Sequence, residues 1–266
     1  MRDEKENKKM KKLLAMLLAL TLVFAFISCG DTDNDDNGDT PAAQVDPNKK
    51  SEGSMTYEQY MAAEMETNVV IEAFVQAKQG WWANKATLYL QDGNGGYFSY
   101  NTQCTEELYN QLAIGTKVKI SGIKTAWKGE VEIKDGTGTI EIIPGDKWIA
   151  PVTDVTAFMG SDNYIDYQNR KVAFKGLTIV ASNEAGDAFL YNWDGSGMEG
   201  SDSDLYFNAS IGDNVYTFVI EYYLTGENSD AYKAVQALEV GDVVDLEGFL
   251  YWYDGAQPHI TSVVVK

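Results

Sequence analysis

The stretch LAIGTKVKISGIKTAWKGEVEI, residues 112–133, decides the fold, because it occurs twice. Its second copy, LEVGDVVDLEGFLYWYDGAQPHI, spans residues 238–260. Glycine recurs at three matching places in the two copies, and branched apolar residues alternate with other residues between the first two glycines. The matching glycines are Gly115 and Gly241, Gly122 and Gly248, and Gly129 and Gly255. Alternation with a period of two is typical of a half-buried strand. The repeat therefore predicts two tandem copies of one small β domain.

The same order of elements surrounds each copy. In the first domain, residues 55–144, we expect a helix at 56–65 followed by three strands at 68–78, 86–92 and 97–101. A second helix at 106–113 and two more strands at 117–127 and 130–143 complete it. Three strands, a helix and two strands is the order of a five-stranded OB barrel. Thr56, Thr105 and Ser229 are the expected N-caps of the helices.

The second domain, residues 152–266, repeats this plan after a linker at 145–151. We expect its strands at 170–182, 187–193, 205–210, 215–223, 243–253 and 259–266, its helix at 229–238, and a polar insertion at 194–204. The predicted fold is all-β with short helices, as two tandem five-stranded OB barrels behind a signal peptide and a flexible tether.

One resemblance can be named from these residues. A helix followed by L-x-x-G-T-K-V-K-I-S-G and then W-x-G (127–129) is similar to OB-fold modules of bacterial secreted proteins and lipoproteins, which also occur appended to extracellular nucleases. The resemblance covers 55–143, and 165–266 less well, because the 194–204 insertion departs from it. It implies a nucleic-acid-type binding module, and it informs more about architecture than about ligand.

The first 28 residues are predicted to be a targeting signal. A lysine-rich start leads into the apolar run 13–27, which is too short for a permanent membrane helix, and Ser28 then precedes Cys29. This resembles a bacterial lipoprotein signal, although Phe26 stands where the usual motif has Leu. The resemblance implies diacylglycerol on Cys29, a membrane-anchored chain and an extracytoplasmic place in the bacterial cell envelope; an ordinary cleaved secretory signal is the alternative. Cys104 then lacks a disulfide partner, and we expect a small buried side chain near a helix start.

Charge is unevenly distributed beyond the signal. Residues 29–54 have no apolar run that could order them, so we expect a flexible acidic tether. An acidic run after the acylated cysteine also resembles the surface-export signals of some bacterial lipoproteins. Residues 152–266 hold 5 basic and 18 acidic side chains, which makes the second domain a poor polyanion binder.

OB folds bind ligands on the face of strands 2 and 3 and on the loops between strands 1 and 2 and strands 4 and 5. In the first domain these places combine tryptophans with lysines. The candidate ligand-binding residues are Lys78, Trp81, Trp82, Lys85, Tyr89, Tyr97, Lys124, Trp127 and Lys128. Aromatic faces bracketed by cations suit stacked single-stranded bases. Sugar rings suit the same faces, so a single-stranded oligonucleotide and a carbohydrate both stay open, and tryptophans that pack over the barrel mouth are the alternative.

Two more lysines lie on a strand next to this candidate site. Lys117 and Lys119 share one face of a strand and would widen this patch, unless Glu130 and Glu132 neutralise them across the hairpin.

The second domain keeps Trp193, Trp252 and Tyr253, but Asp245 stands where the first copy has Lys119. It therefore favours a neutral sugar or a protein partner.

Enzyme chemistry has little support in the sequence. His259 is the only histidine, and we expect it on the surface of an edge strand. The sequence has no nucleophile elbow, no paired-cysteine zinc spacing and no phosphate-cradling loop, so neither a cofactor nor a metal is expected. The overall expectation is a membrane-anchored binding lipoprotein and not an enzyme. The alternative is a structural or protein-interaction lipoprotein with no small ligand.

Overall fold

The computed structural model describes residues 45–145 and 147–266. The predicted signal, Cys29 and most of the predicted tether lie outside the described residues. Among the described residues no helix is long and apolar enough to cross a membrane.

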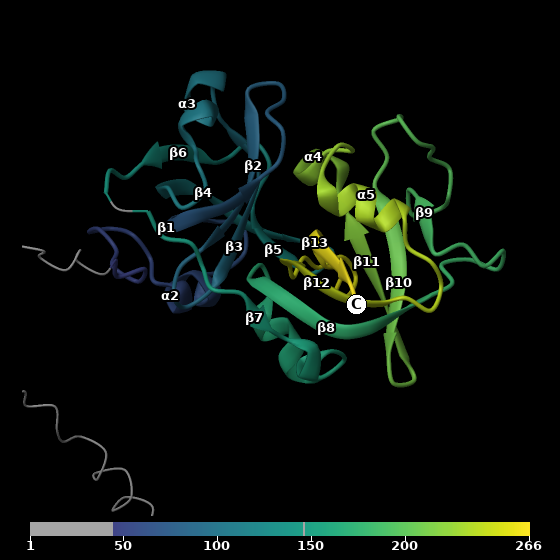
Figure 1. The fold of residues 1–266 in the computed structure, drawn as a ribbon. Helices are drawn as coiled ribbons and strands as arrows, with labels where there is room; N and C mark the ends of the chain where they lie inside the picture. The colour runs from purple at the N-terminus through teal and green to yellow at the C-terminus, as the bar shows by residue number, and fades with distance from the viewer. Residues whose placement is uncertain (1–44, 146) are drawn as a thin grey trace, which may run out of the picture. The chain divides into compact units, whose positions relative to one another are not determined.

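The first barrel is closed by five strands (Figure 1): β1 (Thr67–Lys78), β2 (Lys85–Gln91), β3 (Gly96–Gln103), β4 (Lys117–Trp127) and β5 (Glu130–Ile133). The strands pair in the order β1-β2-β3-β5-β4, and β4 pairs back onto β1. Only the β3–β5 contact within this ring is parallel. This is the order of an OB barrel. Helix α2 (Tyr57–Ala62) precedes β1, α3 (Glu106–Gln111) joins β3 to β4, and β6 (Thr139–Ile142) extends the sheet.

The second barrel repeats this topology with β8 (Lys171–Val180), β10 (Leu205–Ile211), β11 (Asn214–Ile220), β12 (Val243–Phe249) and β13 (His259–Val265). The ring runs β8-β10-β11-β13-β12 and closes on β8, again with one parallel contact between its third and fifth strands. Short elements surround it: β7 (Thr153–Asp154), η1 (Thr156–Phe158), η2 (Asp162–Tyr167), β9 (Phe189–Tyr191), α4 (Tyr222–Thr225) and α5 (Asp230–Gln236). The predicted all-β fold with two five-stranded barrels is confirmed.

Several local expectations hold and others are corrected. Thr56, Thr105 and Ser229 each accept a backbone hydrogen bond as N-caps. The strand expected at 187–193 shrinks to β9, which pairs only with β10 outside the barrel ring, so β10 is the second barrel strand. The strand expected at 130–143 is divided into β5 and β6 by a turn, in which Gly136 has φ +70°.

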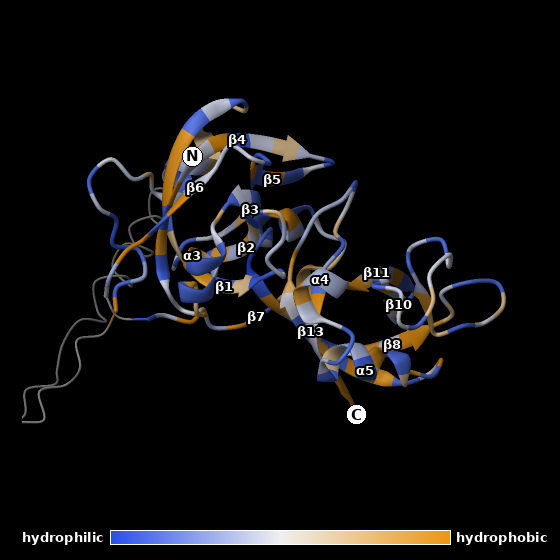
Figure 2. Ribbon diagram, turned by 90° about the horizontal axis from the view of Figure 1, so that it is seen from above, coloured by the Kyte–Doolittle hydropathy of each residue, from blue (hydrophilic) through white to orange (hydrophobic). Residues whose placement is uncertain are grey.

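Each barrel has its own apolar core, built from the inward side chains of its strands. Figure 2 colours the ribbon by hydropathy. The strand β8 is mostly apolar in that view, whereas the loops are mostly polar. Cys104 belongs to the core of the first barrel and is 4% exposed, as expected for a small buried side chain.

The end of the predicted tether is not free. Residues 45–54 lie against the first barrel, where Lys50 Nζ contacts Asp92 Oδ2 at 2.6 Å and Ser54 Oγ donates to Glu72 Oε1 at 2.9 Å. Glu72 and Asp92 are buried, and a buried carboxylate requires such partners. Burial alone would raise the pKa of Glu72, but hydrogen bonds from Ser51 and Ser54 lower it to about 2. The expectation of a flexible tether is therefore wrong for this part.

Glu72, and not Glu130 or Glu132, is the acidic partner of Lys117 and Lys119. Both lysines form ion pairs with it, at 3.1 and 3.3 Å. Glu130 and Glu132 were the expected partners, but they lie across the β4–β5 hairpin from Trp127 and Thr125, toward the other end of β4.

Glycine is required at the repeated positions for two different physical reasons. The first and third pairs, for example Gly115 at φ +84° and Gly129 at +90°, adopt a left-handed conformation that favours glycine. The middle pair has no room for a side chain. A Cβ on Gly248 would lie 2.1 Å from the carbonyl oxygen of His259, and one on Gly122 would lie 2.5 Å from Ile133.

We predict that Gly248→Ala lowers the free energy of unfolding by about 3 kcal/mol, because the backbone of β13 must move away from the new methyl group. Gly80→Ala is the matched control, since its nearest neighbour would be 3.9 Å from the added Cβ. Urea unfolding of both variants measures the difference. Equal stability of Gly248→Ala and the unmodified protein would contradict the close packing of β12 on β13.

Candidate ligand-binding site

Lys124 is not a surface cation. Its side chain is buried, and Nζ donates to the carbonyl oxygens of Tyr60, Met61 and Ala63 at 2.7–2.8 Å. It therefore caps the C-terminal end of α2, where backbone carbonyls lack helical partners. Burial lowers its pKa. The prediction that Lys124 contacts a ligand is wrong, because the lysine faces the interior side of β4.

Tyr97 and Tyr89 are also buried, for different reasons. Tyr97 belongs to the core of the first barrel, and its hydroxyl donates to Asp92 at 2.7 Å. Because strand side chains alternate, its neighbour Phe98 faces outward instead. Tyr89 does face outward on β2, but the second barrel covers it. Neither tyrosine forms the exposed platform that the sequence predicted.

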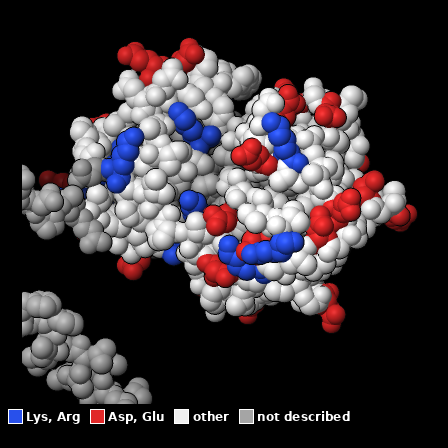
Figure 3. All heavy atoms as spheres, viewed as in Figure 1, with Lys and Arg blue, Asp and Glu red and all other residues white. Residues whose placement is uncertain are grey.

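The remaining lysines of residues 55–144 all have partners. Lys78 donates to the carbonyl of Tyr109, Lys85 pairs with Asp135, Lys128 with Asp254, and Lys134 with Glu66, while Lys117 and Lys119 pair with Glu72. On the face drawn in Figure 3, the basic side chains are interspersed with acidic ones and do not gather into one patch. The expected bracket of free cations around the tryptophans is therefore not present among the described residues.

The three tryptophans of the first barrel differ in exposure. Trp81 is half-buried, and its Nε1 donates to the carbonyl of Cys104 at 2.8 Å. Trp82 is 70% exposed and Trp127 is 59% exposed. Trp127 lines a cleft, whereas Trp81 and Trp82 lie outside it. The sequence analysis grouped the three tryptophans in one candidate site, but the structure places Trp127 at the cleft and Trp81 and Trp82 outside it.

A buried aromatic junction joins the two barrels. Tyr89, Phe98 and Phe249 form one cluster, in which the Tyr89 and Phe249 rings are 4.7 Å apart. The Tyr89 hydroxyl lies 2.6 Å from Nδ1 of His259, and the His259 ring stacks on Tyr251 at 4.2 Å.

His259 was expected on a strand surface, and that expectation is wrong. The residue is only 7% exposed, because the edge of β13 that carries it is covered by the first barrel. Burial lowers its pKa to about 3, so the imidazole is neutral at physiological pH.

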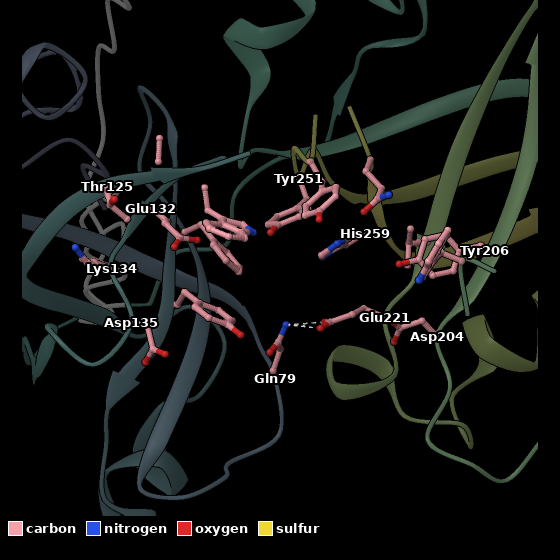
Figure 4. Close-up of a pocket in the computed structure, with 18 residues that line it drawn as sticks. Gln79, Thr125, Glu132, Lys134, Asp135, Asp204, Tyr206, Glu221, Tyr251 and His259 are labelled. Atoms are coloured by element: carbon pink, nitrogen blue, oxygen red, sulfur yellow. Dashed lines mark hydrogen bonds between the residues drawn. The ribbon is translucent and has the colours of Figure 1, made fainter. Parts of the chain in front are cut away.

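A cleft of about 1030 Å³ opens beside this junction, between the barrels (Figure 4). Each barrel contributes the regions by which OB folds bind ligands, the face of strands 2 and 3 and the loop between strands 4 and 5. Its aromatic lining comes from both barrels: Phe98, Tyr100 and Trp127 from the first, and Trp193, Tyr206, Tyr251 and Tyr253 from the second.

Carboxyl groups dominate the charge of the cleft. Glu132 and Asp135 line it on the first barrel, and Asp204 and Glu221 line it on the second. Burial raises the pKa of Glu132 to about 7, with a further contribution from Asp135. Among the described lining residues the one Lys or Arg is Lys134, which pairs with Glu66 outside the cleft at 2.6 Å.

The barrels also meet directly at the cleft. Gln79 Nε2, from the first barrel, donates to both carboxyl oxygens of Glu221 at 2.8 and 2.6 Å. Burial and the nearby Asp204 raise the pKa of Glu221 to about 8, although the hydrogen bond from Gln79 opposes this rise. Across residues 45–145 and 147–266, no group of three or more His, Cys, Asp or Glu residues is arranged to hold a metal ion.

Most of these cleft residues were missed at the level of sequence. Tyr206 is half-buried between the core residues Leu205 and Phe207, so the alternation along β10 marks it as outward-facing. Tyr100 follows Phe98 by two residues and shares its face of β3. Nothing comparable marks Glu221 or His259, because their environment is created by the other barrel.

No family model matches the chain, and no curated protein matches it by sequence. Solved structures with similar folds include the HINa domain of Ifi202 with 20-bp double-stranded DNA, at 12% identity and a TM-score of 0.31, covering 76% of this chain and 96% of that one. A murine DNA-binding protein bound to double-stranded DNA matches at 8% identity and a TM-score of 0.31, covering 75% and 97%. A deletion mutant of the single-stranded DNA-binding protein from Thermus aquaticus matches at 10% and 0.26, covering 75% and 93%. The fold assignment rests on strand order, and these scores are too low to transfer a ligand.

We predict that Lys124→Met destabilises the protein by about 2 kcal/mol or more, because three carbonyl oxygens lose their buried donor. Lys85→Met is the control, since the Lys85–Asp135 pair is partly exposed and should contribute less than about 1 kcal/mol. Chemical unfolding of the two variants compares these roles. A Lys124→Met variant as stable as Lys85→Met would restore Lys124 as a candidate ligand contact.

Proposed function

We propose that the protein is an extracytoplasmic, lipid-anchored binding protein that holds a glycan segment in the cleft between its two OB barrels. The observation that carries the proposal is the lining of that cleft: its described residues include seven aromatic side chains, four carboxyl groups and one Lys or Arg, Lys134, which pairs with Glu66. Clefts of this size with a few polar groups are the usual form of small-ligand sites.

The charge of the cleft favours a glycan over a nucleic acid. Binding a polyanion requires lysines or arginines that displace counterions from the phosphates. The carboxyl groups of this cleft supply no such cation, and in their ionised form they would repel a phosphate backbone. Sugar hydroxyls are donors, and they suit the carboxyl oxygens and the side-chain amides of Gln79 and Gln257.

The aromatic side chains supply the stacking surfaces. Trp127 is 59% exposed, Tyr253 is 44% exposed and Tyr100 is 39% exposed, so a large part of each side chain is accessible in the cleft. Amphipathic aromatic rings provide apolar area together with a polar tip, which suits a ligand that alternates apolar ring faces with hydroxyl edges. The OB fold itself binds oligosaccharides as well as oligonucleotides by these regions.

The proposal is limited to binding without catalysis. The lone histidine is engaged by Tyr89 and Tyr251, and the sequence has no nucleophile motif. A purely structural or protein-binding lipoprotein, the alternative considered above, is an outcome of the experiments below.

We expect Trp127→Ala to weaken glycan binding by about tenfold, which corresponds to the loss of about 1.4 kcal/mol of stacking. Trp82→Ala is the matched control, because Trp82 is also largely exposed but lies outside the cleft. Calorimetric titration of the purified protein with neutral β-glucan, xylan, mannan and chitin fragments measures this, with a single-stranded oligonucleotide in parallel. Oligonucleotide binding that fades with salt and requires Trp82 would contradict the proposal. If none of the probes binds, the result would favour the alternative of a structural or protein-binding lipoprotein.

We expect Cys29→Ser to release the protein from the membrane fraction, because the thiol that would carry the lipid is removed. Fractionation of cells that express either form, followed by immunoblotting, checks this. Membrane retention of Cys29→Ser would rule out lipid anchoring at this cysteine.

A further inference from the structure

Glu132 is a buried carboxyl group that lacks a donor from the protein. It lies on β5, between Thr125 of β4 and Phe98 of β3, and its side chain lines the cleft (Figure 4). The residue is only 6% exposed, and among the described residues it has neither a hydrogen bond nor an ion pair. The charge of Asp135, which has the same sign, adds to burial in raising the pKa of Glu132. Its carboxyl group opens on the cleft, so a donor from a bound ligand can reach it.

Glu221 presents a second carboxyl group from the opposite wall (Figure 4). Its side chain accepts hydrogen bonds from Gln79, and Asp204 beside it adds negative charge. None of the described lysines or arginines forms an ion pair with Glu132, Asp204 or Glu221. The two barrels thus direct unneutralised carboxyl groups into one space.

An aromatic ring lies among these acids. Tyr251 lines the same cleft as Glu132 and Glu221. Burial raises its pKa, and the charges of Glu130, Glu132 and Glu221 raise it further. Trp127 and Tyr253 are exposed in the same cleft. A cation over an aromatic face is attracted by the ring quadrupole, more strongly where water is excluded. Carboxyl groups and aromatic faces together form an environment suited to a positive charge.

We propose that the cleft selects a glycan that carries a cationic amino group, as an amino sugar does, and that Glu132 and Glu221 receive this group from opposite walls. The inference rests on the glycan-binding function proposed above and adds the charge of the ligand. A phosphate-bearing or carboxylate-bearing glycan is excluded by the same groups.

The affinity for such a ligand depends on pH. The charge of Glu132 is coupled to Asp135, Glu130, Tyr60 and Tyr251. The charge of Glu221 is coupled to Asp204, Tyr89, Tyr206 and Tyr251, and Gln79 donates to its carboxyl group. The neutral His259 adds no charge. Because the pKa values of Glu132 and Glu221 are raised to about 7 and about 8, both groups gain negative charge between pH 6 and pH 9. A permanent cation should therefore bind more tightly as pH rises, and a neutral glycan should not.

Two glucosamine tetramers with the same backbone test this in calorimetric titrations of the purified protein. One is fully N-trimethylated and carries a charge that does not titrate; the other is fully N-acetylated and neutral. We expect the cationic tetramer to bind about tenfold more tightly than the neutral one at pH 9, in the range of cation–π and ionic contacts. The preference should fall at pH 6.

The variants Glu132→Gln and Glu221→Gln should each reduce the ratio of the two affinities at pH 9 and flatten its dependence on pH. Glu239→Gln is the matched control, because Glu239 is exposed and lies outside the cleft. It should leave the ratio unchanged. Thermal melting verifies that each variant is folded, and the amide preserves the shape of the side chain.

Each outcome separates the inference from the function on which it rests. Equal affinity of the two tetramers at pH 9, or a ratio that survives both substitutions, overturns the inference and leaves glycan binding intact. Failure of both tetramers overturns the inference, and failure of the whole neutral panel as well overturns the proposed function. Binding of the cationic tetramer alone supports the inference and shows that the charge dominates recognition.

Discussion

The contact between Tyr89 and His259 is the constraint on which the site depends. Each barrel folds around its own core, so neither needs the other to close its ring of strands. The junction of Tyr89, Phe98 and Phe249 instead fixes how the two outer faces meet. A buried hydroxyl and a buried imidazole require partners, and here each satisfies the other at 2.6 Å. Docking of the barrels therefore requires a specific register, and that register creates the cleft.

The cleft follows from the topology once this junction exists. In an OB barrel, strands 2 and 3 and the loop between strands 4 and 5 form the side that carries ligands. The two copies turn these sides toward each other, so one part of each becomes the buried junction and the rest becomes the walls. The burial that stabilises the junction also removes water from Glu132 and Glu221, which raises the pKa of both. The docking of the two barrels thus accounts for the cleft, for the raised pKa values of Glu132 and Glu221, and for the proposed ligand preference.

The sequence was sufficient for the barrels but not for the site. Glycines that need a left-handed conformation or a close approach, such as Gly115 and Gly248, leave a pattern that any repeat of the fold must keep. Outward-facing residues leave no comparable pattern. Tyr97 and Phe98 differ by one position, and only the pleat decides which lies in the core. Likewise, the sequence cannot tell a lysine that binds a ligand from one that caps a helix, as Lys124 does, and the environment of His259 depends on a residue 170 positions away.

The protonation of His259 tests the docking of the barrels most directly. It is the only histidine in the chain, so its imidazole signals in a ¹H–¹⁵N NMR spectrum need no assignment. A pH titration of the purified protein should show the ring neutral down to at least pH 4, because burial against Tyr89 and Tyr251 lowers its pKa to about 3. A midpoint near 6.5, the value of an exposed histidine, would contradict the account, since the junction and the cleft beside it would then not form.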